Sequence, residues 1–201
     1  MSTRVAVLGA GTMGTGIAHV FAQYGYAVSW VEVDKARWQV ALQTLAQNVD
    51  RQIKKGLLKP EDKEPLLARL TFYDQIAPAV EGAALVVEAV PENVALKKQV
   101  WREVSQYAPR EAILATNTSS ISITLLAAEV ERPERFIGMH FMNPVPVMRL
   151  VEVIRGLQTD DATADAVLEW SRKLGKEPVL VQDYPGFVSN RVLMPMINEA
   201  I

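Results

Sequence analysis

The sequence predicts an α/β fold, a doubly wound and mostly parallel sheet with helices on both faces. Apolar runs of strand length alternate with longer segments of helical period along most of the 201 residues. A glycine-rich turn follows the first strand and opens the first helix. Runs such as ALVVEAV are almost continuously apolar, which is typical of strands buried on both faces of a parallel sheet.

The elements are expected in a regular order. A strand over 4–9 leads into a helix over 12–25, and a strand over 26–33 leads into a long helix over 34–56. Asp34 is the candidate N-cap of the long helix. The remaining strands are expected at 70–73, 84–90, 112–117, 136–141, 149–156 and 177–183, and the remaining helical segments at 59–70, 79–82, 92–108, 120–130 and 160–175.

Composition limits the classes of function. The hydrophobic content of 49% and charged content of 22% are ordinary for a globular protein. The absence of cysteine excludes disulfides and thiolate metal sites, and we predict no metal. A net charge of −2 gives no reason to expect nucleic acid or an anionic membrane as a partner. Because neither a signal peptide nor a long apolar span is evident, a cytoplasmic location is predicted.

The segment VAVLGAGTMGTGIA carries a dinucleotide-binding pattern. Gly9 allows a tight turn, Gly11 lets the backbone approach a pyrophosphate, and Gly14 lets the helix pack on the strand. The helix N-terminus offers N–H groups and partial positive charge to the phosphates. Glu32, at the end of the next strand, is placed to accept hydrogen bonds from ribose hydroxyls. We therefore predict a Rossmann-type domain, the alternative being a glycine turn that only packs tightly.

The neighbourhood of Glu32 also bears on the choice of cofactor. A carboxylate there repels the 2′-phosphate of NADP, and Asp34 adds to that repulsion. Lys35 and Arg37 act against it, because a basic pair just downstream can hold a phosphate. The sequence favours NAD.

The stretch GMHFMNPVPVMRLVEVI places His140 and Glu152 inside runs that otherwise read as buried strands. Buried ionisable side chains are unfavourable unless they are paired. Either the two groups satisfy each other structurally, or the fold holds an acid/base couple for chemistry.

Together with this stretch, the glycine loop, VVEAVPEN, ATNTSS and DYPGFVSNR stand in an order that resembles the 3-hydroxyacyl-CoA dehydrogenases. The chain looks most similar to their bacterial short-chain branch, which acts on 3-hydroxybutyryl-CoA. The resemblance covers essentially the whole chain. It implies transfer of hydride between NAD and C3 of an L-3-hydroxyacyl-CoA, in fatty acid or butanoate metabolism.

The resemblance also implies roles for individual residues. His140 is the general base for the hydroxyl proton, and Glu152 orients its imidazole. Ser119 meets the substrate oxygen and the nicotinamide region, the alternative being that Ser119 or Ser120 caps the following helix. Asn190 contacts the substrate near the reacting carbons, the alternative being an amide on the helix surface.

Further residues are assigned to the ligands by the same resemblance. Glu92 and Lys97 fall near the ribose and nicotinamide side of NAD, and Asn117 either reaches the cofactor or only shapes its turn. Asn48 and Lys55 fall near coenzyme A, although a solvated basic helix end explains Lys55 nearly as well. The full cofactor set is Gly9, Ala10, Gly11, Thr12, Met13, Gly14, Glu32, Glu92, Lys97, Asn117 and Ser119.

The turn DYPGF is the expected domain boundary. Residues 1–183 are expected to form the NAD-binding domain, and 184–201 the start of an all-α substrate and dimerisation domain, truncated after its first helix. The resemblance implies a homodimer for the full-length form. Two other interpretations stay open: a dehydrogenase of the β-hydroxyacid class with a lysine as acid/base, and a dinucleotide-binding module or fragment without turnover.

Overall fold

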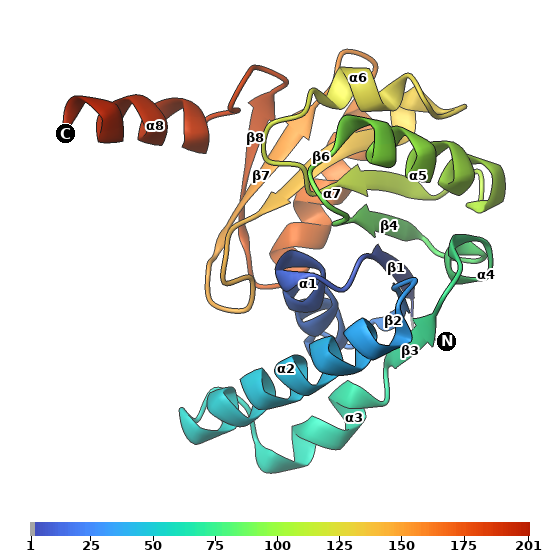
Figure 1. Ribbon diagram of the computed structural model, residues 1–201, viewed down its shortest axis with the longest axis vertical. Helices are drawn as coiled ribbons and strands as arrows, with labels where there is room; N and C mark the ends of the chain where they lie inside the picture. Colours follow the sequence, from blue (N-terminus) through green and yellow to red (C-terminus); the bar gives the residue numbers. More distant parts are fainter. Residues whose placement is uncertain (1–2) are drawn as a thin grey trace.

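The apolar runs of the sequence form one eight-stranded sheet with the order β3-β2-β1-β4-β5-β6-β7-β8. The computed structural model describes residues 3–201 (Figure 1). All neighbouring strands are parallel except β6 and β7, which are antiparallel. The prediction of a mostly parallel, doubly wound sheet is therefore confirmed. The strands are β1 Arg4–Leu8, β2 Ala27–Val31, β3 Leu70–Tyr73, β4 Leu85–Glu88, β5 Ile113–Thr116, β6 Phe136–Phe141, β7 Leu150–Arg155 and β8 Glu177–Gln182.

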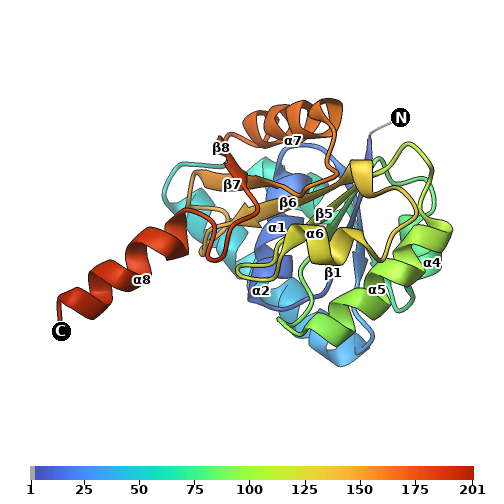
Figure 2. The same cartoon turned by 90° about the horizontal axis from the view of Figure 1, so that it is seen from above.

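Helices cover both faces of this sheet (Figure 2). One face carries α1, α2 and α7, and the other carries α4, α5 and α6. The α-helices are α1 Thr12–Gln23, α2 Lys35–Lys54, α3 Lys63–Leu67, α4 Ile76–Val80, α5 Val94–Tyr107, α6 Ile123–Ala127, α7 Asp161–Lys173 and α8 Ser189–Glu199, with short 3₁₀ turns at Pro60–Asp62 and Pro133–Arg135.

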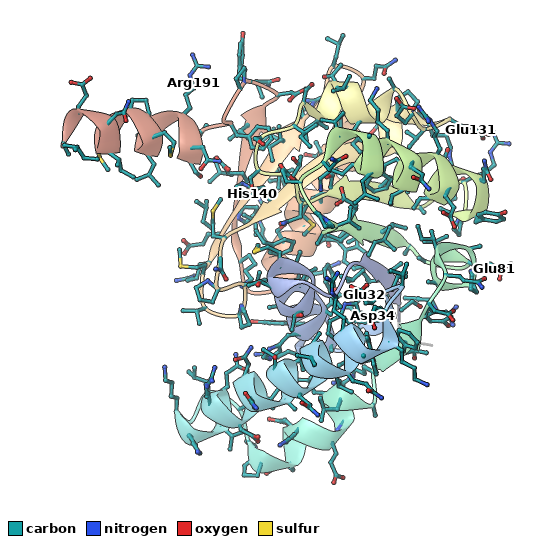
Figure 3. All side chains as sticks on the ribbon, viewed as in Figure 1. Glu32, Asp34, Glu81, Glu131, His140 and Arg191 are labelled. Carbon is teal, nitrogen blue, oxygen red and sulfur yellow. The ribbon has the colours of Figure 1, made fainter. Side chains whose placement is uncertain are left out.

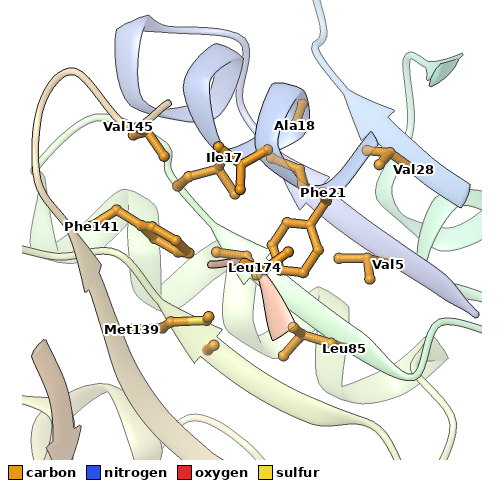
Figure 4. Close-up of a cluster of buried hydrophobic side chains, with 14 of the residues drawn as sticks. Val5, Ile17, Ala18, Phe21, Val28, Leu85, Met139, Phe141, Val145 and Leu174 are labelled. Carbon is orange, nitrogen blue, oxygen red and sulfur yellow. The ribbon is translucent and has the colours of Figure 1, made fainter. Parts of the chain in front are cut away.

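Two apolar clusters hold the layers together. In the cluster under α1, Phe21 packs between Ile17 and the sheet residues Val5 and Leu85 (Figure 4). On the other face, Trp101 of α5 is fully buried against the sheet. Since each square ångström of apolar surface removed from water contributes about 25 cal/mol, burial of these large side chains stabilises the packing of the helices on the sheet.

The helix ends follow the predicted signals. The Asp34 carboxylate accepts hydrogen bonds from the backbone N–H groups of Ala36 and Arg37, so it is the N-cap of α2. Gly25 and Gly56, just beyond α1 and α2, have φ values of +91° and +70°, which glycine adopts without strain.

The helix expected at 120–130 is shorter in the structure. Its N-cap is Ser122, whose hydroxyl accepts from the Leu125 N–H, so the alternative in which Ser119 or Ser120 caps this helix is wrong. The Asp183 carboxylate, at the end of β8, accepts from the N–H groups of Ile123 and Thr124 as well. The carboxylate and the hydroxyl together fix the start of α6 at Ile123.

Helix α8 extends away from the rest of the molecule (Figures 1 and 2). None of its residues is buried. Its apolar side chains are exposed, and they include Val192, Leu193, Met196 and Ile197. Helix α8 therefore presents an exposed apolar face.

Candidate active site

The glycine loop lies where the strand order reverses, between β1 and its neighbours β2 and β4. A Cβ on Gly14 would lie 2.0 Å from the carbonyl oxygen of Gly9, and one on Gly9 would lie 2.8 Å from that of Ala89. Gly11 stands at the N-cap of α1 and has open space around it. The first turn of α1 therefore receives no side-chain cap from Gly11, and its N–H groups can receive a diphosphate, as in dinucleotide-binding folds.

Glu32 lies directly beside this loop. Its carboxylate is 6% exposed and accepts hydrogen bonds from Ala10 N at 3.2 Å and from Asp34 N at 3.3 Å. Figure 3 shows Glu32 near the start of α1, well separated from His140. The two backbone N–H groups hold the carboxylate at the end of β2, where a ribose would need an acceptor.

An apolar cleft of about 250 Å³ adjoins Glu32. Val31, Ile76 and Val90 line it together with Arg37. Apolar walls next to a carboxylate suit the adenosine end of a dinucleotide.

A second cleft of about 220 Å³ lies across the loop from the first. It brings together five predicted cofactor residues, namely Met13, Glu92, Lys97, Asn117 and Ser119. The Glu92 carboxylate accepts hydrogen bonds from the hydroxyls of Thr118 and Ser120 and from the Ser119 N–H at 3.0 Å. Burial alone would raise the pKa of Glu92, but these hydrogen bonds and the Lys97 ammonium lower it.

Lys97 belongs to a buried network that the sequence did not predict. Its ammonium donates to Glu88, and the second carboxylate oxygen of Glu88 accepts from the Thr116 hydroxyl at 2.7 Å. Glu88 and Thr116 are fully buried, and Lys97 is 1% exposed. A carboxylate within the apolar run LVVE is the same signal that pointed to Glu152, and it could have identified Glu88.

His140 and Glu152 face each other across the antiparallel strands β6 and β7. The imidazole Nδ1 lies 2.8 Å from Glu152 Oε2, and both side chains are almost fully buried. The other oxygen, Oε1, accepts from the backbone N–H groups of Val188 at 3.1 Å and Ser189 at 2.8 Å. Burial alone would raise the pKa of Glu152, but hydrogen bonds from His140, Ser189 and Val188 lower it to about 2.

Phe187 completes the wall beside the imidazole. Its ring lies edge-on to that of His140 with centroids 6.0 Å apart. It is buried and has a φ of +50°, a left-handed conformation that costs a non-glycine residue free energy. Phe187 was not among the predicted site residues, although its place in the PGF turn was a usable signal.

Asn190 and Ser119 are also brought together. The Asn190 amide nitrogen donates to the carbonyl oxygen of Ser119 at 3.1 Å, so α8 is tied to the end of β5. The Asn117 side-chain oxygen accepts from the Phe141 N–H at 2.9 Å. Asn117 therefore shapes the strand ends and also lines the second cleft.

Asn48 and Lys55 lie on α2 and just beyond it, away from the imidazole. Both line a cleft of about 370 Å³, whose opposite wall is formed by Pro144, Pro146 and Val147. Arg51 lines it as well and donates to the side-chain oxygen of Asn48 at 2.9 Å. A neighbouring cleft shares Asn48 and continues to Ala10, Gly11 and Thr12 of the glycine loop.

A glycine loop with a buried carboxylate beside it, together with a buried imidazole–carboxylate pair at the same end of the sheet, is typical of a nicotinamide-dependent dehydrogenase. Residues 4–184 match the family model of the 3-hydroxyacyl-CoA dehydrogenase NAD-binding domain. The chain belongs to the 3-hydroxyacyl-CoA dehydrogenase family.

Individual relatives agree with this assignment. The chain is 46% identical over 198 residues to a 3-hydroxybutyryl-CoA dehydrogenase of Bradyrhizobium diazoefficiens, covering 98% of this chain and 67% of that protein. It is 46% identical to a probable 3-hydroxybutyryl-CoA dehydrogenase of Bacillus subtilis, covering 98% and 69%. The crystal structure of (S)-3-hydroxybutyryl-CoA dehydrogenase from Ralstonia eutropha has a TM-score of 0.95 and 48% identity, covering 100% of this chain and 70% of that one.

These findings confirm the predicted family, the enzyme class and NAD as cofactor. They do not favour a nucleotide-binding module without turnover. Among residues 3–201, no helix has both the length and the apolar character needed to cross a bilayer. Within the same residues, no group of three or more His, Asp or Glu side chains is arranged as a metal site.

Proposed function

We propose that this chain oxidises L-3-hydroxyacyl-CoA at C3 with NAD, that its preferred substrate is 3-hydroxybutyryl-CoA, and that His140 is the general base. The observation that carries the proposal is the buried His140–Glu152 pair, with 2.8 Å between Nδ1 and Oε2. The relatives named above support the short acyl chain.

The tautomer of His140 follows from its partner. The pKa of Glu152 is about 2, so its carboxylate is ionised near pH 7 and can only accept a hydrogen bond. His140 Nδ1 therefore donates to Glu152, which leaves Nε2 as the acceptor for the substrate hydroxyl proton. The Glu152 carboxylate then stabilises the imidazolium that forms. Bound NAD supplies the hydride acceptor.

The remaining site residues are proposed to place the two ligands. The glycine loop would hold the diphosphate and Glu32 the adenosine ribose, while Glu92, Lys97 and Asn117 would border the nicotinamide side. The Ser119 hydroxyl and the Asn190 amide would contact the substrate near its reacting carbons. Support comes from the cleft that Glu92, Lys97, Asn117 and Ser119 line together, and from the hydrogen bond that the Asn190 amide donates to the Ser119 carbonyl oxygen.

Coenzyme A is proposed to lie along the cleft that Asn48 and Lys55 share with the 142–149 loop. The position of the cleft supports this placement, since the cleft adjoins the glycine loop and the loop that joins β6 to β7. Three further points remain predictions from the sequence. They are the domain division at 183/184, a homodimer of the full-length form and a cytoplasmic location.

The proposal is tested by following NADH absorbance with acetoacetyl-CoA as the second substrate. The unmodified chain is expected to oxidise NADH, and longer acyl chains are expected to be used less well. His140→Gln is expected to lower turnover by about 10²–10⁴, the usual contribution of a general acid or base. Its affinity for NADH, measured by fluorescence, should stay the same because the glycine loop is distant from the imidazole.

His19 supplies a matched control, because the chain has two histidines. His19 lies in α1, with Nε2 3.2 Å from the side-chain oxygen of Gln52. His19→Gln should keep turnover. Full turnover by His140→Gln would contradict the assignment of the base, and a loss of NADH binding together with a lower Tm would show that the pair is structural.

A further inference from the structure

Lys176 is a buried cation that the proposed chemistry does not use. It follows Gly175 at the turn from α7 into β8, and its side chain is 8% exposed. The ammonium donates to two backbone carbonyl oxygens, those of Val145 and of Met148, the second at 2.8 Å. Within residues 3–201 it forms no ion pair with a carboxylate.

A buried ammonium group is unfavourable unless hydrogen bonds compensate for its lost hydration. Burial disfavours the charged form and lowers the pKa of Lys176 to about 8. An apolar side chain of the same length would fill the volume without that penalty. The two carbonyl contacts are therefore the feature that distinguishes lysine from a packing residue here.

Both carbonyls belong to the loop 142–149, which joins β6 to β7 and so connects the strands of His140 and Glu152. The loop folds on itself, because the N–H groups of Val147 and Met148 both donate to the Pro144 oxygen at 2.9 Å. Lys176 thus holds both sides of one turn.

The opposite side of the loop is fixed by α1. A Cβ on Gly16 would lie 2.8 Å from the Cβ of Val145, so the absence of a side chain at Gly16 lets the loop approach the helix. Figure 4 shows Val145 beside Ile17 of α1. The loop is therefore held between Gly16 and the Lys176 ammonium.

Held in this position, the loop forms one wall of both clefts that run along α2. Pro144, Val145 and Pro146 line the cleft next to the glycine loop, and Pro144, Pro146 and Val147 line the cleft with Asn48 and Lys55. A shift of the loop would change the width of these clefts, but it would leave the Glu32 side of the cofactor site untouched.

We propose that Lys176 is a positioning residue for the acyl-CoA substrate, because its ammonium fixes the 142–149 loop as the wall of the substrate cleft. The proposal rests on the proposed function. Substrate affinity would then depend on the loop carbonyls being held. Binding of NADH would depend on them less, because no residue of the loop lines the clefts at Glu32 and Glu92.

Lys176→Met tests this, since it keeps the length of the side chain and removes the donors. The KM for acetoacetyl-CoA is expected to rise about tenfold or more, the size expected for losing charge-assisted hydrogen bonds. The KM for NADH should rise much less than the KM for acetoacetyl-CoA, because the loop adjoins the cofactor only at the glycine loop. Lys176→Arg should restore part of the substrate affinity. Lys173→Met is the control, since Lys173 is an exposed partner of Glu169 on α7.

Two further measurements keep the test decisive. Hydrogen exchange of the Val147 and Met148 amides should be faster in Lys176→Met and unchanged in Lys173→Met, whether or not the enzyme turns over. Gly16→Ala adds a methyl group on α1 that displaces the loop, so it should raise the KM for acetoacetyl-CoA. This variant provides the test if the Lys176 variants do not fold.

The outcomes separate the two proposals. An equal rise in both KM values, or unchanged exchange of the loop amides, would overturn the role of Lys176. Absence of NADH oxidation by the unmodified chain would refute the proposed function instead, and the exchange experiment would then still decide whether Lys176 fixes the loop.

Discussion

At the scale of single residues, Glu32 shows how the backbone prepares a side chain for recognition. Its carboxylate is buried beside the glycine loop, and the N–H groups of Ala10 and Asp34 hold both of its oxygens. A fixed acceptor loses little conformational entropy when a ribose binds. A carboxylate fixed in this position would also repel the 2′-phosphate of NADP.

Glu32→Ala is expected to weaken NADH binding roughly tenfold or more and to narrow the gap between NADH and NADPH, since it removes both the acceptor and the repulsion. Fluorescence titration with each nucleotide measures this. Glu32→Gln separates the two effects, because it keeps a hydrogen-bonding side chain and removes the charge. Tighter binding of NADPH than NADH by the unmodified chain would contradict the choice of NAD.

Residue identities allowed part of the site to be predicted. Glycines at this spacing, between a strand and a helix, are typical of a phosphate-binding turn, and a histidine and a glutamate in apolar strands must find partners. Which serine caps α6 was not predictable, because three serines precede it and the choice depends on Asp183 from β8. The burial of Lys97 was not predictable, because its ion pair with Glu88 depends on how α5 packs beside β4.

At the scale of elements, periodicity and caps predicted the long helices and the strands within a few residues. The antiparallel pairing of β6 with β7 brings His140 opposite Glu152, and a contact of this kind depends on register. The hydrogen bonds from the Val188 and Ser189 N–H groups to Glu152 were not predictable. They depend on the shape of the turn between β8 and α8, which the sequence does not specify.

This attachment predicts a dependence of stability on acid. The pKa of Glu152 is lowered from 4.5 to about 2 in the folded chain, so its stabilising contribution is complete above the unfolded pKa and is lost as the pH falls from 4.5 to 2. The shift corresponds to about 3 kcal/mol as an upper estimate. Urea unfolding between pH 6 and pH 3 should show the decline, and Glu152→Gln should flatten it in the acid part.

His19 acts in a separate and higher window. Burial lowers its pKa from 6.5 to about 4, so the folded chain keeps it neutral and loses stability as the pH falls from 6.5 to 4. The two contributions have the same sign. His19→Gln should therefore remove the decline in the free energy of unfolding between pH 6.5 and 4 and leave the decline below it. If neither His19→Gln nor Glu152→Gln changes the pH profile, other carboxylates dominate the loss of stability in acid.

At the scale of the whole molecule, the sheet and both apolar clusters are complete without α8. The clusters draw their residues from the segment before α8, and none of the residues of α8 is buried. Only the start of α8 is attached, through Glu152 and through the hydrogen bond from Asn190 to Ser119. The chain spans 67% to 70% of the length of the relatives named above. The nucleotide site can therefore form independently of what covers this helix.

The exposed apolar face of α8 is expected to make this chain self-associate, because contiguous apolar surface is a common site of association. Val192 is 63% exposed and Ile197 is 42% exposed. The apparent mass in sizing chromatography should rise with concentration. Ile197→Lys should lower it, whereas Asn198→Lys, which adds the same charge to a polar neighbour, should change it much less. Affinity for NADH should be equal in all three proteins, since the glycine loop is far from α8. A mass that is monomeric at every concentration would show that the exposed face of α8 does not drive association, and equal affinity in that case would still support an independent nucleotide site.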